Sequence, residues 1–94
     1  MPNKETLVAL RVLENENRSS LLELIEKNPD INKTQLISLT SRDRVEISID
    51  TQLLTGTGLI TNHGFGDTAI FKITLKGERI LKALREKNFN YLEV

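Results

Sequence analysis

The residues of this chain that could carry out acid–base, nucleophilic or metal chemistry are few and scattered. The sequence contains a single histidine, His63, and no cysteine or tryptophan. It offers no paired carboxylic acids, no nucleophile beside a base and no cluster of metal-ligand types. The stretches Gly56-Thr57-Gly58 and Gly64-Phe65-Gly66 lack the Gly-Lys-Ser/Thr that follows in a phosphate-binding loop, so they indicate turns. We therefore expect neither catalytic activity nor a bound metal ion or cofactor.

The remaining chemistry is electrostatic binding, and the charges that could support it are unevenly spread. The chain holds 13 Lys and Arg residues against 13 Asp and Glu residues, so its net charge is zero. Residues 1–30 and 31–71 are each slightly acidic, whereas residues 72–94 carry six basic and three acidic side chains. A polyanion would approach this last third first, although an ordinary solvated helix face would look the same.

Length and composition indicate one small globular domain. The chain has 94 residues, of which 38% are apolar and 28% charged, in the usual range for a soluble protein. Its apolar runs are too short to cross a membrane, and the N-terminal MPNKETLV is not followed by the apolar core of a signal peptide. We expect residues 1–94 to form a single cytoplasmic domain with no membrane partner.

The first third of the chain predicts two helices. Leu7, Leu10 and Leu13 lie near one face of a helix over about residues 4–15, which we expect to break near Asn15–Ser19. Ser20 and Glu23 have the spacing of a capping box for the second helix, which Asn28-Pro29 ends. One continuous helix from 4 to 27 is the alternative.

The middle of the chain contains conflicting local signals. Asn32, with Gln35 three residues later, can cap a helix that ends at Thr40-Ser41. In residues 42–55 the β-branched residues alternate with polar ones, which favours a strand. The two β-rich runs that follow, LITNH and TAIFKIT, flank the turn GFGD and predict a hairpin. Val45, Ile49 and Leu53 are also spaced four apart, and a glycine stop follows at Gly56 and Gly58, which favours a helix. With the hairpin after that stop, we predict that residues 42–55 are helical.

The last helix completes an α+β, mostly helical domain. Thr74 can cap it, and its sequence is LKGERILKALREKN. Leu75, Ile80, Leu81 and Leu84 lie along its apolar face.

Three phrases in this order carry a family resemblance: LLELIEKNPDINKTQLISLT, LLTGTGLI and FKITLKGERILKAL. They resemble the helix–strand–helix, the exit of the recognition helix and the aromatic-x-Ile-Thr-x-x-Gly motif of winged helix-turn-helix proteins, especially small bacterial and archaeal transcription regulators. The match covers about residues 19–87. It implies a winged helix-turn-helix with a core at about residues 19–75, an extra helix at 4–15 and a C-terminal helix at 75–88. It also implies sequence-specific binding of double-stranded DNA and regulation of transcription.

The resemblance makes residues 42–55 the recognition helix and residues 62–68 the wing tip. At 100° per residue, an apolar arc of this helix should face the core, and the opposite polar arc should face a major groove. The apolar arc consists of Val45, Ile49 and Leu53, and the polar arc of Arg44, Ser48, Thr51 and Thr55, with Gln52 at its edge. On that polar arc Arg44 would read guanine or bind phosphate, and Gln52 would pair with adenine.

Other residues would contact the DNA backbone or the minor groove. They are Arg42 at the start of the recognition helix, Lys33 and Thr34 at the start of the preceding helix, Asn62 and His63 in the wing, and Lys72 after the wing. A solvated helix surface is the alternative for the polar arc, and an ordinary exposed turn is the alternative for His63.

Two features depart from the pattern of a DNA-binding winged helix. The predicted recognition helix carries three carboxylates, Asp43, Glu46 and Asp50, and the wing tip NHGFGDT has no Lys or Arg. Phe65 at that tip is either a wedge against DNA or a residue docked on the domain or on a partner. A winged-helix module that binds protein without DNA is therefore the alternative function.

The two ends of the chain predict a homodimer. Both flanking segments carry more apolar side chains than the small central unit can cover. The expected interface consists of Leu7, Leu10, Leu13, Leu84, Phe89, Tyr91 and Leu92. A two-fold pair would present two recognition helices about 34 Å apart, one turn of DNA. Folding back of both ends onto their own domain is the alternative.

Overall fold

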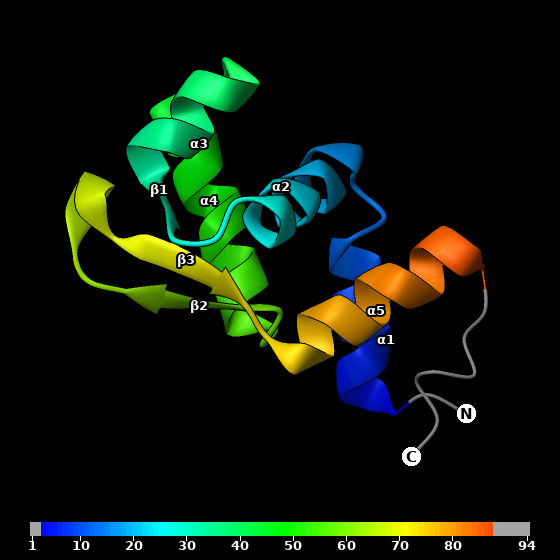
Figure 1. Cartoon of the computed structure of the whole chain (residues 1–94). Coiled ribbons are helices and arrows are strands. Elements are labelled where there is room, and N and C mark those ends of the chain that lie inside the picture. Colours follow the sequence, from blue (N-terminus) through cyan, green and yellow to red (C-terminus); the bar gives the residue numbers. More distant parts are fainter. Residues whose placement is uncertain (1–2, 88–94) are drawn as a thin grey trace.

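The computed structural model describes residues 3–87, and these form five helices around a small antiparallel sheet (Figure 1). The elements follow the chain as α1 (Lys4–Val12), α2 (Glu16–Lys27), β1 (Ile31–Asn32), α3 (Lys33–Thr40), α4 (Arg44–Gly56), β2 (Ile60–His63), the 3₁₀ turn η1 (Gly66–Thr68), β3 (Ile70–Ile73) and α5 (Leu75–Glu86). The predicted order of helices and hairpin is confirmed.

Helices α1 and α2 are separate, but the break lies earlier than predicted. The Asn15 side chain accepts hydrogen bonds from the backbone N–H groups of Asn17 and Arg18, so it caps α2. The predicted capping box at Ser20 is wrong, because Ser20 already lies inside the helix. An Asn at the N-cap stabilises the turn that follows it as well as Ser does, and it comes first along the chain.

The capping box of α3 is confirmed. The Asn32 side chain accepts from the N–H of Gln35, and the Gln35 side chain accepts from the N–H of Asn32. The helix ends at Ser41, whose left-handed backbone turns the chain toward α4. Asp43 is the N-cap residue of α4 rather than part of its first turn, and its side chain makes no capping hydrogen bond.

Residues 44–56 are helical, as predicted against their alternating pattern. The hairpin that follows pairs β2 with β3, with Ile60 opposite Ile73 and His63 opposite Ile70. β1 joins the other side of β3, so the strand order is β1-β3-β2. The connection between the hairpin strands runs over residues 64–69 and contains η1, which makes it longer than the predicted four-residue turn. We call residues 60–73 the wing.

The core draws on every helix. Phe71 of the central strand belongs to one buried cluster with side chains of α2, α3 and α4, and Ala9 of α1, Leu13 after it and Ile80 of α5 complete that cluster. The hydrophobic core thus includes side chains on both sides of residues 19–75. In α5 the apolar face is confirmed for Ile80 and Leu81, whereas Leu75 is 62% exposed because it lies in the first turn, away from that face.

The molecule is elongated, with dimensions of 37 × 22 × 20 Å. The wing projects at one end and α1 and α5 lie at the other, so the ends of the described chain are far from the wing tip (Figure 1). No helix among residues 3–87 is long and apolar enough to span a membrane.

Candidate nucleic-acid interface

Helix α4 presents a different face to solvent from the one predicted. Val45, Ile49 and Leu53 are 60%, 53% and 40% exposed, so the apolar arc expected in the core points outward. Thr51, expected on the outer face, is only 3% exposed, and its hydroxyl donates to the backbone oxygen of Ile47. Thr51 is therefore unavailable to DNA. The buried side of α4 consists of Ile47, Asp50, Thr51 and Leu54.

The helix is turned this way because Asp50 is buried and paired. Its carboxylate accepts a hydrogen bond from Arg42 Nη2 at 2.6 Å and lies 3.7 Å from Arg18 Nη1. Arg18 also donates to the backbone oxygen of Val12, so the same guanidinium joins the α1–α2 corner to α4. A buried carboxylate with two cationic partners is tolerated in a core, whereas a helical wheel counts it as polar and turns it outward.

Arg42 is consequently a structural residue rather than a free DNA contact. Its guanidinium binds Asp50 and also Glu46, with 3.3 Å between Nε and the carboxylate oxygen. The hydrogen bond to Asp50 raises the pKa of Arg42, against the opposing effect of burial. Two of the three carboxylates near α4, Glu46 and Asp50, are thus paired with Arg42.

Asp67 ties the wing to both helices of the helix-turn-helix. Its carboxylate accepts a hydrogen bond from Arg44 at the start of α4. Its backbone oxygen accepts from the hydroxyl of Thr34 in the first turn of α3, at 3.4 Å. Arg44 thus pairs with the carboxylate of the wing rather than with one of α4. The contact fixes the wing beside α4.

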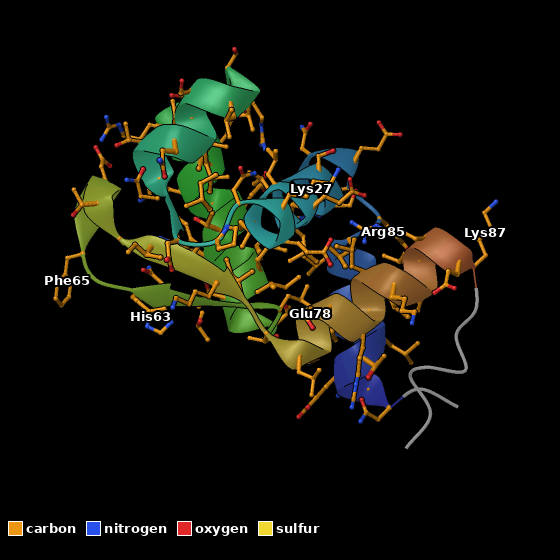
Figure 2. All side chains as sticks on the ribbon, in the orientation of Figure 1. Lys27, His63, Phe65, Glu78, Arg85 and Lys87 are labelled. Atoms are coloured by element: carbon orange, nitrogen blue, oxygen red, sulfur yellow. The ribbon has the colours of Figure 1, made fainter. Side chains whose placement is uncertain are left out.

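The wing tip exposes an aromatic ring and few polar donors. Phe65 is 94% exposed and points away from the domain, with His63 nearby on β2 (Figure 2). The His63 ring nitrogen Nε2 lies 2.8 Å from the hydroxyl of Thr61, and Asn62 is exposed. Gly64 and Gly66 have positive φ angles of 112° and 64°, which other residues rarely adopt, so they shape this turn.

The other predicted DNA contacts are spread around this end of the domain. Gln52 and Thr55 are exposed and Ser48 is half-buried on α4, and Lys33 is half-buried at the start of α3. Lys72 lies on β3, and its Nζ is 3.4 Å from a carboxylate oxygen of Asp30, which lies in the turn before β1. Gln52 thus shares the outer face of α4 with Val45 and Ile49, rather than lying at the edge of a polar arc.

The predicted dimer residues are only partly available. Leu13 is 4% exposed and belongs to the core of its own chain, so its assignment to the interface is wrong. Leu10 and Leu84 are partly buried against that core, whereas Leu7 is 51% exposed beside Val8. Phe89, Tyr91 and Leu92 lie outside the described residues.

The candidate interface is an exposed surface formed by α4 and the wing. Across residues 3–87, no three His, Asp or Glu side chains are grouped to hold a metal ion. The described chain presents a packed helix, α4, with an exposed outer face, and a wing held beside it.

No protein-family model matches the sequence, and no curated protein matches it either. Solved structures do share its fold. HlyU from Vibrio cholerae superposes with a TM-score of 0.75 at 18% identity, over 88% of this chain and 90% of that one. The homodimeric winged helix-turn-helix DNA-binding domain of Mb0332 from Mycobacterium bovis, a possible ArsR-family regulator, gives 0.77 at 18% identity, over 95% and 82%.

A third likeness is to the multiple antibiotic-resistance repressor MarR from Listeria monocytogenes. Its TM-score is 0.73 at 17% identity, and the match covers 93% of this chain and 61% of the repressor. These likenesses confirm the predicted winged helix-turn-helix fold, with α3 and α4 as the helix-turn-helix and residues 60–73 as the wing.

Proposed function

We propose that this chain is a sequence-specific double-stranded DNA-binding protein that regulates transcription as a homodimer. The observation that carries the proposal is the open outer face of α4 beside a wing that Asp67 holds in place through Arg44 and Thr34. A helix about 10–12 Å across fits a major groove about 12 Å wide. The likeness to a domain described as a homodimeric DNA-binding winged helix-turn-helix supports this reading.

Within this proposal, some residues recognise the bases and others bind the DNA backbone and so position the protein. Gln52 on the outer face would make paired hydrogen bonds to adenine, with Ser48 and Thr55 as additional donors. Lys33 and Thr34, in the first turn of α3, would bind phosphate together with the backbone amides there. Asn62 and His63 would contact the backbone beside the wing. Arg44 would exchange Asp67 for a phosphate, because an exposed ion pair contributes only about 0–1 kcal/mol.

A homodimer would place two such surfaces on one DNA site. The exposed Leu7 and Val8 on α1 form an apolar surface at the end of the molecule opposite the wing. Two-fold pairing there would leave both α4 helices free for half-sites about 34 Å apart. It would also double the phosphate contacts of a chain with zero net charge.

The second candidate function is a module that binds protein without DNA. The observation that favours it is the exposed aliphatic row on α4, combined with the ion pairing of Arg42 and Arg44. Such a surface attracts phosphate less than an outer face with free arginines would.

Selection of bound sequences from random duplex DNA distinguishes the two functions. We expect enrichment of a two-fold symmetric site whose affinity falls steeply as salt rises, because bound cations release counterions from the duplex. Failure to enrich any sequence, with binding absent at low salt, would refute DNA binding and favour the protein-binding module.

Two matched charge variants then locate the interface on the selected duplex. Lys33→Gln should weaken binding to all sequences about equally and make the salt dependence shallower by about one phosphate contact. Lys87→Gln, at the far end of α5 from the wing tip, should change neither (Figure 2). Equal effects of the two variants would contradict the placement of DNA at α3 and α4.

A further inference from the structure

We propose that the outer face of α4 recognises A·T base pairs by covering thymine methyl groups with Val45 and Ile49, beside Gln52. This inference rests on the proposed DNA binding and names the bases that the surface selects. It follows from which side chains of α4 are exposed and from where the neighbouring arginines are bound.

Three side chains lie along the most outward line of the helix. Val45, Ile49 and Gln52 fall within an arc of about 60° opposite the buried side, and all three are exposed. Gly56 ends the same line, and a Cβ there would have no atom within 4 Å. This line is uncharged, and its side chains are exposed, so it can face a groove.

The apolar members of that line have one apolar partner in a major groove. Among the base edges exposed there, only thymine carries a methyl group, at C5. Val45 and Ile49 are β-branched, so each has essentially one side-chain conformation in a helix and loses little freedom on contact. Gln52 adds the matching polar contact, because a glutamine amide pairs with adenine N6 and N7.

The side chains that would read guanine are already bound elsewhere. Arg42 is held by Asp50 and Glu46, and Arg44 points to Asp67 in the wing. The pairs of Arg42 keep its guanidinium away from the outward line of α4, and Arg44, when it leaves Asp67, would bind the DNA backbone as proposed above rather than a base. The described face therefore favours A·T pairs over G·C pairs.

A protein partner fits this face less well than DNA. Val45, Ile49 and Leu53 are each only partly exposed, and together they fall far short of the roughly 800 Å² that each side of a stable protein interface buries. Lys33 at the start of α3 has no ion-pair partner among the described residues, so a free cation stands on the neighbouring helix for a phosphate. A small apolar area on α4 beside the cation of Lys33 is suited to DNA, where a base edge lies next to the phosphates of its backbone.

The geometry also predicts the spacing of the thymines. Val45 and Ile49 are one helical turn apart, a rise of about 6 Å. Base pairs are spaced about 3.4 Å along the axis. We expect the two methyl groups on base pairs about two steps apart, with an adenine beside them.

Replacing thymine by deoxyuridine in the selected duplex tests the inference, because it removes only the methyl group. Each methyl that Val45 or Ile49 covers should cost about fourfold in affinity, the value of one buried carbon. Deoxyuridine outside the half-sites should change nothing. The measurement is the Kd of each synthetic duplex at one fixed salt concentration.

Protein variants test whether the affinity lost with deoxyuridine comes from contacts of α4. Ile49→Ala should bind the thymine duplex more weakly and lose its sensitivity to deoxyuridine at one position, as a double-mutant cycle requires for a direct contact. Leu39→Ala, an exposed leucine on α3 away from the outward line of α4, should keep the full sensitivity. Circular dichroism checks that each variant is folded.

The outcomes separate this inference from the proposed function. A selected duplex that binds equally well with thymine and deoxyuridine overturns methyl recognition and leaves DNA binding intact. Enrichment of G·C-rich half-sites overturns it as well. If no duplex is retained by the folded protein, both proposals fail and the aliphatic row of α4 is left to a protein partner.

Discussion

Asp50 shows how one residue determines what helix α4 presents to solvent. Its side chain is 9% exposed and lies between the guanidinium groups of Arg42 and Arg18. Both arginines are mostly buried, so neither charge is well solvated by water. Removing the carboxylate would leave cations in a site of low polarity, which is the costly way to break a buried ion pair.

We expect Asp50→Ala to lower the free energy of unfolding by about 3 kcal/mol, the lower end for a buried pair because both arginines keep some exposure. Glu46→Ala is the matched control: it removes an exposed partner of the same Arg42 and should cost less than about 1 kcal/mol. Urea unfolding followed by circular dichroism measures both. Equal small losses would mean that Asp50 does not hold α4 in place.

At the scale of elements, Gly77 determines how closely α5 approaches the wing. A Cβ built on this residue would lie 2.3 Å from the backbone oxygen of Leu59 and 2.8 Å from a side-chain carbon of Ile73. Thr74 strengthens the same junction, because its hydroxyl donates to the backbone oxygen of Gly58 at 2.6 Å and accepts from the N–H of Gly77. The glycine in the aromatic-x-Ile-Thr-x-x-Gly phrase is thus required by packing rather than by its backbone angles.

Gly77→Ala should destabilise the protein by about 1–3 kcal/mol, because the backbone of the chain before β2 must move to admit a methyl group. Gly56→Ala, also at a helical glycine, meets no atom within 4 Å and should leave stability unchanged or raise it by up to about 1 kcal/mol. Thermal unfolding midpoints measure the difference. A Gly77→Ala protein as stable as the parent would contradict the close packing of α5.

At the scale of the whole molecule, the two ends have different surfaces. The wing lies at one end and α1 and α5 at the other, and α4 runs between them and contacts both β2 and α1 (Figure 1). Leu7 and Val8 expose about half of their surfaces on α1, while Ala9 and Leu13 of the same segment are buried. The terminal helices therefore both complete the core and leave an apolar surface on α1, away from the wing tip.

We expect sedimentation equilibrium at micromolar concentration to give twice the 10.7 kDa mass of one chain. The double variant Leu7→Ser, Val8→Ser should shift the protein toward the monomer, since it removes apolar area from the proposed interface. Leu39→Ser, an equally exposed leucine on α3, should leave the dimer unchanged. A parent protein that sediments as a monomer would rule out the homodimer.

Local interactions explain what the sequence by itself determined. The Asn32–Gln35 capping box, the end of α2 before Pro29 and the hairpin after α4 involve residues close together in the chain. Their energies depend on nearby backbone groups, so type and spacing suffice to predict them. The order of elements then identified the winged helix-turn-helix.

Only the tertiary structure decided which side of α4 faces solvent. The helix carries apolar residues on two sides, so periodicity alone placed Val45, Ile49 and Leu53 in the core and Thr51 outside, which was wrong. The choice depends on Asp50 and its partner Arg18, which lies 32 residues earlier and meets it only after folding. The ion pairs offset the cost of burying the carboxylate. Because Arg18 is distant from Asp50 in the sequence, no local pattern in α4 contains this interaction.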